Sequence, residues 1–180
     1  MPTETISLDN GALLTIRDAQ VQDAVALLRY LDTIGGETDF LTFGAYEFSH
    51  SLEEEEAYIQ ECLHTDNKLL ILGLINDEIV GVLHFTGEAK RRMRHSGEFG
   101  VSVPKAHWGL GIGSHLIRTM IEWAKAGEVI RKINLRVRSD NVRAIRLYEK
   151  FGFTREGEIS REFLIDGIFY SNIFMGMPID

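Results

Sequence analysis

The sequence contains a single cysteine and no long run of apolar residues. One thiol, Cys62, cannot form a disulfide within the chain, so the protein does not need an oxidising compartment. No apolar run approaches the roughly 18 residues of a membrane-spanning helix, and the first residues lack the basic and apolar regions of a signal peptide. We therefore expect a cytoplasmic protein with no membrane partner.

Basic residues are scarce relative to acidic ones. The chain has 19 lysines and arginines against 27 aspartates and glutamates, a net charge of −8. Nucleic-acid binding requires a basic face that neutralises phosphates, so no nucleic-acid partner is expected. The same surplus repels a phosphorylated ligand at long range, so backbone amides and a few local cations would have to hold one at short range. An acidic surface weakly favours cationic partners such as amines.

No repeat, linker or low-complexity segment divides the chain, so we expect one domain over residues 1–180. Hydrophobic periodicity predicts a sequence of helices and strands. They are a hairpin within 5–18, a helix over 21–31 ended by Gly35-Gly36, a helix from the capping box at 51–54, strands at 68–75, 79–85 and 97–103, a helix from 112, a strand at 132–138, a helix over 141–151 and a last hairpin over 153–177. This order predicts a mixed α/β (α+β) fold, with a central sheet of about seven strands and helices on both faces.

The most informative stretch is a glycine-rich turn between the strand at 97–103 and the following helix. Gly109, Gly111 and Gly113 have no Cβ, so their backbone allows close approach of phosphate oxygens. The first turn of a helix adds unpaired N–H groups at the positive end of the helix dipole. The turn is therefore predicted to bind a pyrophosphate. Lys105, His107 and His115 lie close in sequence and could offset the unfavourable net charge.

Other common site motifs do not fit. The third glycine of a dinucleotide-binding G-x-G-x-x-G would fall on Ser114 or Leu116, and that motif belongs to a parallel sheet. The chain has neither the Gly-Lys-Ser/Thr triplet of a P-loop nor the G-x-S-x-G turn of a serine hydrolase. The six histidines show no metal-ligand spacing with Cys62, so no metal site is expected.

Two stretches resemble the signatures of the GCN5-related N-acetyltransferase (GNAT) family. Trp108-Gly-Leu-Gly-Ile-Gly113 resembles the loop that binds the pyrophosphate of acyl-CoA, and Asn141 to Phe153 resembles the second signature. The resemblance covers about residues 5–177 and is nearest to the ribosomal-protein and polyamine branch, where tryptophan often replaces the family's glutamine or arginine at position 108. It implies that acetyl-CoA is bound by Val101, Ser102, Val103, Trp108, Gly109, Leu110, Gly111, Ile112, Gly113, Ser114 and Asn141.

The resemblance also implies a reaction, the direct transfer of acetyl from acetyl-CoA to a primary amine on a small molecule or a protein N-terminus. Tyr148, seven residues after Asn141 on the same helix face, would be the general acid that protonates the departing thiolate. A phenol with a pKa near 10 carries its proton at neutral pH. Spacing alone would favour a core tyrosine, and the two motifs together favour the catalytic role. Glu98 is the first candidate for the base that deprotonates the amine, with Glu37 and Glu47 as alternatives.

Several points stay open at this stage. The main alternative is an acyl-CoA-binding sensor or regulatory protein of the same fold that does not catalyse transfer. Residues 30–46 and 166–172 are expected to contact the acceptor, whose identity the sequence does not give. Edge strands of this fold often pair between subunits, so a homodimer is also a possibility.

Overall fold

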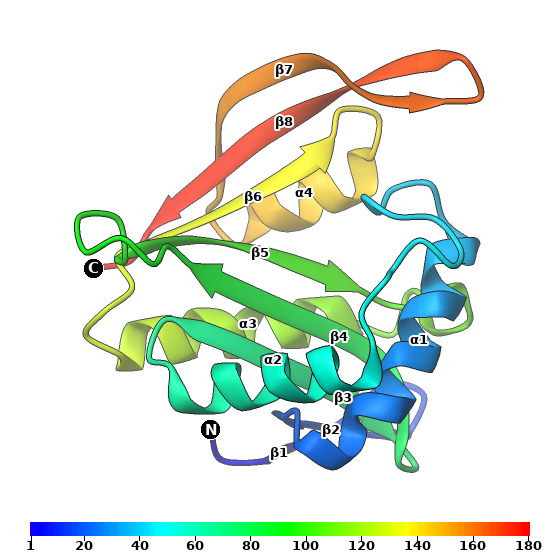
Figure 1. The fold of residues 1–180 in the computed structure, drawn as a ribbon, viewed down its shortest axis with the longest axis vertical. Coiled ribbons are helices and arrows are strands. Elements are labelled where there is room, and N and C mark those ends of the chain that lie inside the picture. The colour runs from blue at the N-terminus through cyan, green and yellow to red at the C-terminus, as the bar shows by residue number, and fades with distance from the viewer.

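The computed structural model describes all residues from 1 to 180, and they form one eight-stranded sheet with four α-helices (Figure 1). The strand order across the sheet is β1-β2-β3-β4-β5-β6-β8-β7. None of the helices is both long and apolar enough to cross a membrane. The strands are β1 (Glu4–Ser7), β2 (Leu13–Asp18), β3 (Lys68–Ile75), β4 (Glu78–Gly87), β5 (Ser96–Ser102), β6 (Lys132–Arg138), β7 (Thr154–Ile165) and β8 (Ile168–Pro178). The helices are α1 (Ala24–Glu37), α2 (Leu52–His64), α3 (Ile112–Ala126) and α4 (Val142–Lys150), with 3-10 turns η1 (Val21–Asp23) and η2 (Lys105–His107).

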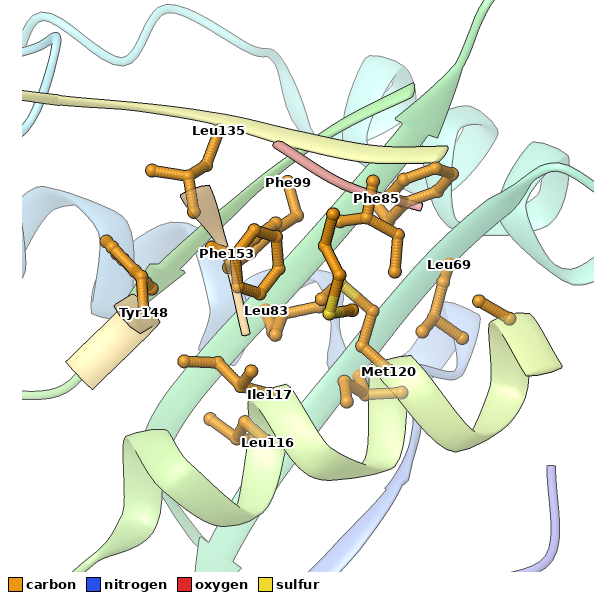
Figure 2. Packing of buried hydrophobic residues seen from close by; sticks show 14 of the residues in the cluster. Leu69, Leu83, Phe85, Phe99, Leu116, Ile117, Met120, Leu135, Tyr148 and Phe153 are labelled. Carbon is orange, nitrogen blue, oxygen red and sulfur yellow. The ribbon is translucent and has the colours of Figure 1, made fainter. Parts of the chain in front are cut away.

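The helices cover opposite faces of the sheet and give it two hydrophobic cores. On one face, the apolar stripe of α3 and the inner side of α4 pack against the sheet in the larger core (Figure 2). On the other face, α1 and α2 bury the smaller core. Side chains alternate between the faces along each strand, so Leu83 and Phe85 of β4 enter the larger core while Val82 enters the smaller one.

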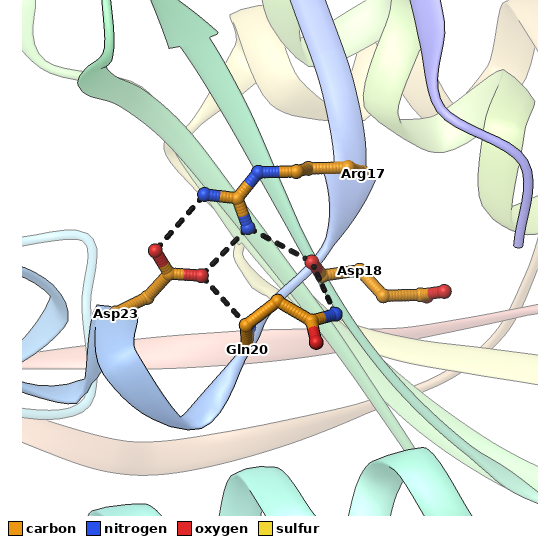
Figure 3. Close-up of polar contacts among 4 residues, drawn as sticks. All are labelled: Arg17, Asp18, Gln20 and Asp23. Carbon is orange, nitrogen blue, oxygen red and sulfur yellow. Dashed lines mark hydrogen bonds and ion pairs between the residues drawn. The ribbon is translucent and has the colours of Figure 1, made fainter.

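A short polar network fixes the chain where β2 leads through η1 into α1 (Figure 3). The Arg17 guanidinium donates to both oxygens of Asp23, at 2.6 and 2.9 Å, and the Gln20 backbone N–H donates to the same carboxylate at 2.7 Å. Burial alone would raise the pKa of Asp23, but the hydrogen bonds from Arg17 and Gln20 lower it below its usual value. The network sets the direction in which α1 leaves the sheet.

The sheet opens between β5 and β6. These two strands are parallel, whereas every other neighbouring pair is antiparallel. Their pairing ends at Glu98 and Asn134, although β5 stays paired with β4 as far as Ser102. The two strands then diverge (Figure 1), so one edge of β5 has no strand beside it from Phe99 to Ser102.

The mixed α/β fold with helices on both faces is confirmed, with one strand more than the seven expected because the first hairpin contributes both β1 and β2. The capping box at Ser51 and Glu54 is present as predicted. The predicted helix end at Gly35-Gly36 is wrong, since α1 continues to Glu37. A Cβ on Gly35 would lie 2.6 Å from the Gly44 carbonyl oxygen, so these glycines allow close packing against the next segment and do not end the helix.

Candidate active site

The turn between β5 and α3 depends on backbone conformations that favour glycine. Gly109 and Gly111 have φ angles of +88° and +80°, in the left-handed region. A Cβ on Gly109 would meet nothing within 4 Å, so the space beside the turn is open. Gly111 is the N-cap of α3, and no side chain caps this helix. The first N–H groups of α3 therefore have no side-chain cap and are available to an anion.

Trp108 anchors the turn to the end of β5. Its indole Nε1 donates a hydrogen bond of 2.7 Å to the carbonyl of Val103. The Arg143 guanidinium of α4 lies over the indole ring, 4.8 Å from its centre. Next to it, the Nδ1 atom of His107 is buried without a hydrogen-bond partner. Sequence reasoning missed Arg143, because only folding brings α4 against this turn.

The remaining residues predicted to bind acetyl-CoA lie along the same path. Val101 and Ser102 belong to the part of β5 that has left β6, and Val103 follows them. The Ser102 hydroxyl is hydrogen-bonded to the Tyr30 hydroxyl of α1 at 2.9 Å, so this side chain faces α1. Ile112 is 1% exposed, so its side chain belongs to the core and only its backbone faces the turn. Leu110 packs on the core, and Gly113 and Ser114 lie in the first turn of α3.

These features together fit a diphosphate attached to an extended arm. The glycines leave room for phosphate oxygens, and α3 supplies uncapped N–H groups. The open edge of β5 offers backbone donors and acceptors of the kind that an added strand uses. No group of three or more His, Cys, Asp or Glu side chains is placed to hold a metal ion.

Tyr148 lies beside the opening between β5 and β6. Its ring packs edge-on against Phe99, with centroids 5.7 Å apart, and against Phe153 at 6.1 Å (Figure 2). The hydroxyl makes no hydrogen bond within the protein, and burial raises the pKa of Tyr148 to about 12. Asn141 caps α4, accepting a hydrogen bond from the Ala144 N–H at 3.2 Å. The structure therefore holds a protonated phenol at the start of the open stretch of β5.

All three carboxylates considered as bases already have partners. Glu98 accepts a hydrogen bond of 2.8 Å from Arg136 of β6. Glu37 accepts from the Lys105 backbone N–H at 2.8 Å, and Glu47 accepts from the Gly44 N–H at 2.7 Å. Because Phe99 faces Tyr148, the adjacent Glu98 projects from the opposite face of β5. The structure does not bring Glu98 and Tyr148 together on one face.

Arg138, at the end of β6, organises the face that α1 and α2 cover. It is only 8% exposed and binds both carboxylate oxygens of Asp140, at 2.7 and 3.0 Å. Its third contact is the Asp39 carbonyl at 3.0 Å. The guanidinium lies 4.4 Å from the ring centre of Phe40 and 4.1 Å from that of Tyr170. Sequence reasoning gave Arg138 no such role, because Asp39, Phe40 and Tyr170 are far from it along the chain.

Comparison with known proteins agrees with this geometry. A family model described as Acetyltransferase (GNAT) family matches residues 38–153. The chain is 28% identical over 169 residues to the SPbeta prophage-derived uncharacterized N-acetyltransferase YokL of Bacillus subtilis, covering 93% of this chain and 90% of that protein. It is 30% identical over 105 residues to the L-amino acid N-acetyltransferase AaaT of Escherichia coli, covering 58% of this chain and 65% of that protein.

A solved structure gives the same result for the whole fold. The crystal structure of an acetyltransferase of the GNAT family from Streptococcus pneumoniae superposes with a TM-score of 0.89 at 32% identity. The match covers 93% of this chain and 99% of the other. The chain therefore belongs to the GNAT family of acetyltransferases and is an acetyl-CoA-dependent N-acetyltransferase.

Proposed function

We propose that this enzyme transfers acetyl directly from acetyl-CoA to a primary amine, with Tyr148 as the general acid. The observation that carries the proposal is the position of Tyr148, against Phe99 at the point where β5 leaves β6. Burial keeps the phenol protonated far above neutral pH. A proton donor there can neutralise a thiolate as it leaves the open edge of β5.

The binding of acetyl-CoA is assigned to the turn and to the open strand edge. In this proposal Gly109 to Ser114 surround the pyrophosphate, and Val101 to Val103 pair with the extended arm. Trp108 holds the turn in place, and Asn141 caps the helix that carries Tyr148. When bound, the cosubstrate supplies the acetyl thioester, and these residues orient it.

The acceptor is proposed to reach the thioester from the face that α1 and α2 cover. The segment over residues 38–50 and the β7–β8 hairpin meet there through Arg138. The relative AaaT acts, by its name, on L-amino acids, so an amino acid heads the acceptor classes that we propose. A polyamine, an aminated antibiotic and a protein N-terminal amine follow.

A panel of amines tests this function. Thiol release from acetyl-CoA should be followed with L-amino acids, spermidine, an aminoglycoside and a peptide with a free N-terminus, and products identified by mass spectrometry. The proposal requires at least one amine to become acetylated in step with thiol release. Acetyl-CoA binding by calorimetry with every amine inert would instead favour a non-catalytic sensor.

A homodimer formed through the β7 edge is also proposed. β7 has no neighbour on its outer side, and the outer part of its hairpin exposes Leu164, Ile168 and Phe169. An unpaired edge beside exposed apolar side chains favours pairing with a second copy. Light scattering should give the mass of a dimer, and a monomer at every concentration tested would contradict this part.

A further inference from the structure

His84 of β4 is a titratable group that the reaction outlined above does not use. Its ring makes no hydrogen bond or ion pair within the protein, and the residue is solvent-exposed although the ring packs over Gly100. By contrast, the carboxylates of Glu98, Glu37 and Glu47 all have partners. His84 is therefore the unengaged base on this face of the sheet.

The position of His84 relates it to the open edge of β5. In the β4–β5 ladder His84 is directly opposite Gly100, which belongs to the stretch of β5 that no longer pairs with β6. A Cβ on Gly100 would lie 2.5 Å from Cε1, 3.1 Å from Nε2 and 3.3 Å from Nδ1 of His84. The imidazole thus lies over the glycine, in space that any other residue at position 100 would fill.

The imidazole and Tyr148 lie on opposite faces of the same strand. Phe99 faces Tyr148, so Gly100 turns its other side to the face that α1 and α2 cover, where His84 lies. An acetyl group carried through the opening between β5 and β6 would therefore have the phenol on one side and the imidazole on the other. An amine arriving from the α1 and α2 face approaches on the side of β5 where the imidazole lies.

We propose that His84 is the general base that deprotonates the acceptor amine, directly or through one water molecule. This inference rests on the proposed function. The ammonium ion of the acceptor gives one proton to a ring nitrogen of His84, which passes it to solvent. The freed electron pair forms the C–N bond as the C–S bond breaks, and the sulfur takes the proton of Tyr148. The second proton on the nitrogen leaves through solvent and restores the phenol, so the net release is one proton for each acetyl group transferred.

The surroundings of His84 favour the neutral imidazole. Although the residue is solvent-exposed, the protein packed around its ring lowers the pKa of His84 below the usual 6.5 through burial, and the nearby Glu98 only partly opposes this. The other titratable or charged side chains on this face come from three elements and one loop. They are Tyr30 of α1, Tyr58, Glu55 and Cys62 of α2, His50 before α2, and Arg136 and Arg138 of β6. His50 is paired with Glu55, and Arg138 with Asp140. Both tyrosines are neutral because burial raises their pKa, and Arg136 is paired with Glu98. At pH 7 the imidazole is therefore free to accept a proton.

The test compares His84→Gln with wild type, using whichever amine the panel identifies. The loss of a general base predicts a fall of about 10²-fold in kcat at pH 7, with the KM for acetyl-CoA unchanged. In wild type, kcat/KM should rise with pH through the pKa of His84, below 6.5, as the imidazole loses its proton. His84→Gln should lack this rise, and added imidazole should partly restore the activity of His84→Ala.

Two further variants separate this role from others. His64→Gln removes an exposed histidine at the end of α2 that is bonded only to the Gln60 carbonyl, and it should leave rate and pH profile unchanged. Glu98→Gln removes the charge that raises the pKa of His84, so the rise in kcat/KM should move to lower pH while activity persists. An NMR titration of the His84 ring should give the same shift without any assay of activity.

The outcomes distinguish the two proposals. A wild-type protein that acetylates no amine overturns the proposed function. An active wild type whose rate and pH profile survive in His84→Gln overturns the role of His84 alone. If Glu98→Gln abolishes both the rate and the rise with pH while His84→Gln keeps them, the base is Glu98.

Discussion

Gly111 serves the fold and the binding turn at once. Its φ angle of +80° costs other L-residues roughly 1–2 kcal/mol, and its position at the N-cap leaves the first N–H groups of α3 uncovered. Gly111→Ala should therefore lower the free energy of unfolding by about 1 kcal/mol and weaken acetyl-CoA binding. Urea denaturation and isothermal calorimetry measure the two effects.

Gly157→Ala is the matched control, because its added Cβ meets nothing within 4 Å and its φ is not in the left-handed region. It should change neither the stability nor the affinity appreciably. Equal behaviour of the two alanine variants would contradict the role given to Gly111.

At the same scale, the sequence correctly predicts the glycine turn but not what Trp108 does. The sequence identifies Trp108 only as a residue that often replaces the family's glutamine or arginine in one branch. The indole N–H donates to the Val103 carbonyl and supports Arg143. The motif predicts the backbone because its glycines act locally, whereas the partners of a side chain are set by the surrounding fold.

At the scale of elements, Arg138 joins three segments: the end of β6, the segment over residues 38–50 and β8. Arg138→Lys should lower the free energy of unfolding by about 1–3 kcal/mol. A single ammonium group cannot replace a buried guanidinium that binds both oxygens of Asp140 and stacks on two aromatic rings. The 38–50 segment should also be cut faster by proteases, since Asp39 and Phe40 lose their contact.

The exposed Arg136→Lys is the control for stability, because surface ion pairs contribute only about 0–1 kcal/mol. Chemical denaturation and limited proteolysis with mass spectrometry measure both variants. If Arg138→Lys behaved like Arg136→Lys in both experiments, the structural role of Arg138 would be wrong.

At the scale of elements, hydrophobic periodicity predicts the bounds of some helices and strands but not of others. Strands and helices with a clear apolar period were predicted almost at their observed bounds, for example α3 and β6. The end of α1 was misjudged because Gly35-Gly36 resembles a helix stop. A side chain at Gly35 would clash with the Gly44 backbone. No local sequence pattern reveals this contact.

At the scale of the whole molecule, three tyrosines with raised pKa values make the free energy of unfolding depend on pH in alkaline solution. Burial raises the pKa of Tyr30, Tyr58 and Tyr148, the last to about 12. A group whose folded pKa lies above its unfolded value of 10.0 stabilises the fold fully below pH 10. This stability is lost as the pH rises towards 12, because the unfolded chain releases its protons first.

The free energy of unfolding should therefore fall between pH 10 and pH 12, and less steeply in Tyr148→Phe than in wild type. Tyr46→Phe, at a residue that is 87% exposed, serves as the control and should follow wild type. Denaturant titrations at several pH values measure the slopes. Identical slopes for wild type and Tyr148→Phe would contradict the burial argument.

The sequence assigns the acceptor side to residues 30–46 and 166–172, but the contacts that build this side are evident only in the whole molecule. These contacts join residues far apart along the chain, as Tyr30 meets Ser102 and Arg138 meets Asp39. The residues proposed to bind acetyl-CoA lie within two short stretches, so local patterns were enough to propose them. The role proposed for His84 depends on its pairing with Gly100, which only the sheet register reveals.

The most direct test of the central claim is the rate of thiol release from acetyl-CoA by wild type and Tyr148→Phe at pH 7, with a saturating acceptor amine. The phenylalanine keeps the packing against Phe99 and Phe153 and removes only the hydroxyl. We predict a fall in kcat of about 10²-fold or more, with the KM for acetyl-CoA unchanged and acetylated amine formed in step with thiol. An unchanged kcat in Tyr148→Phe would contradict the account.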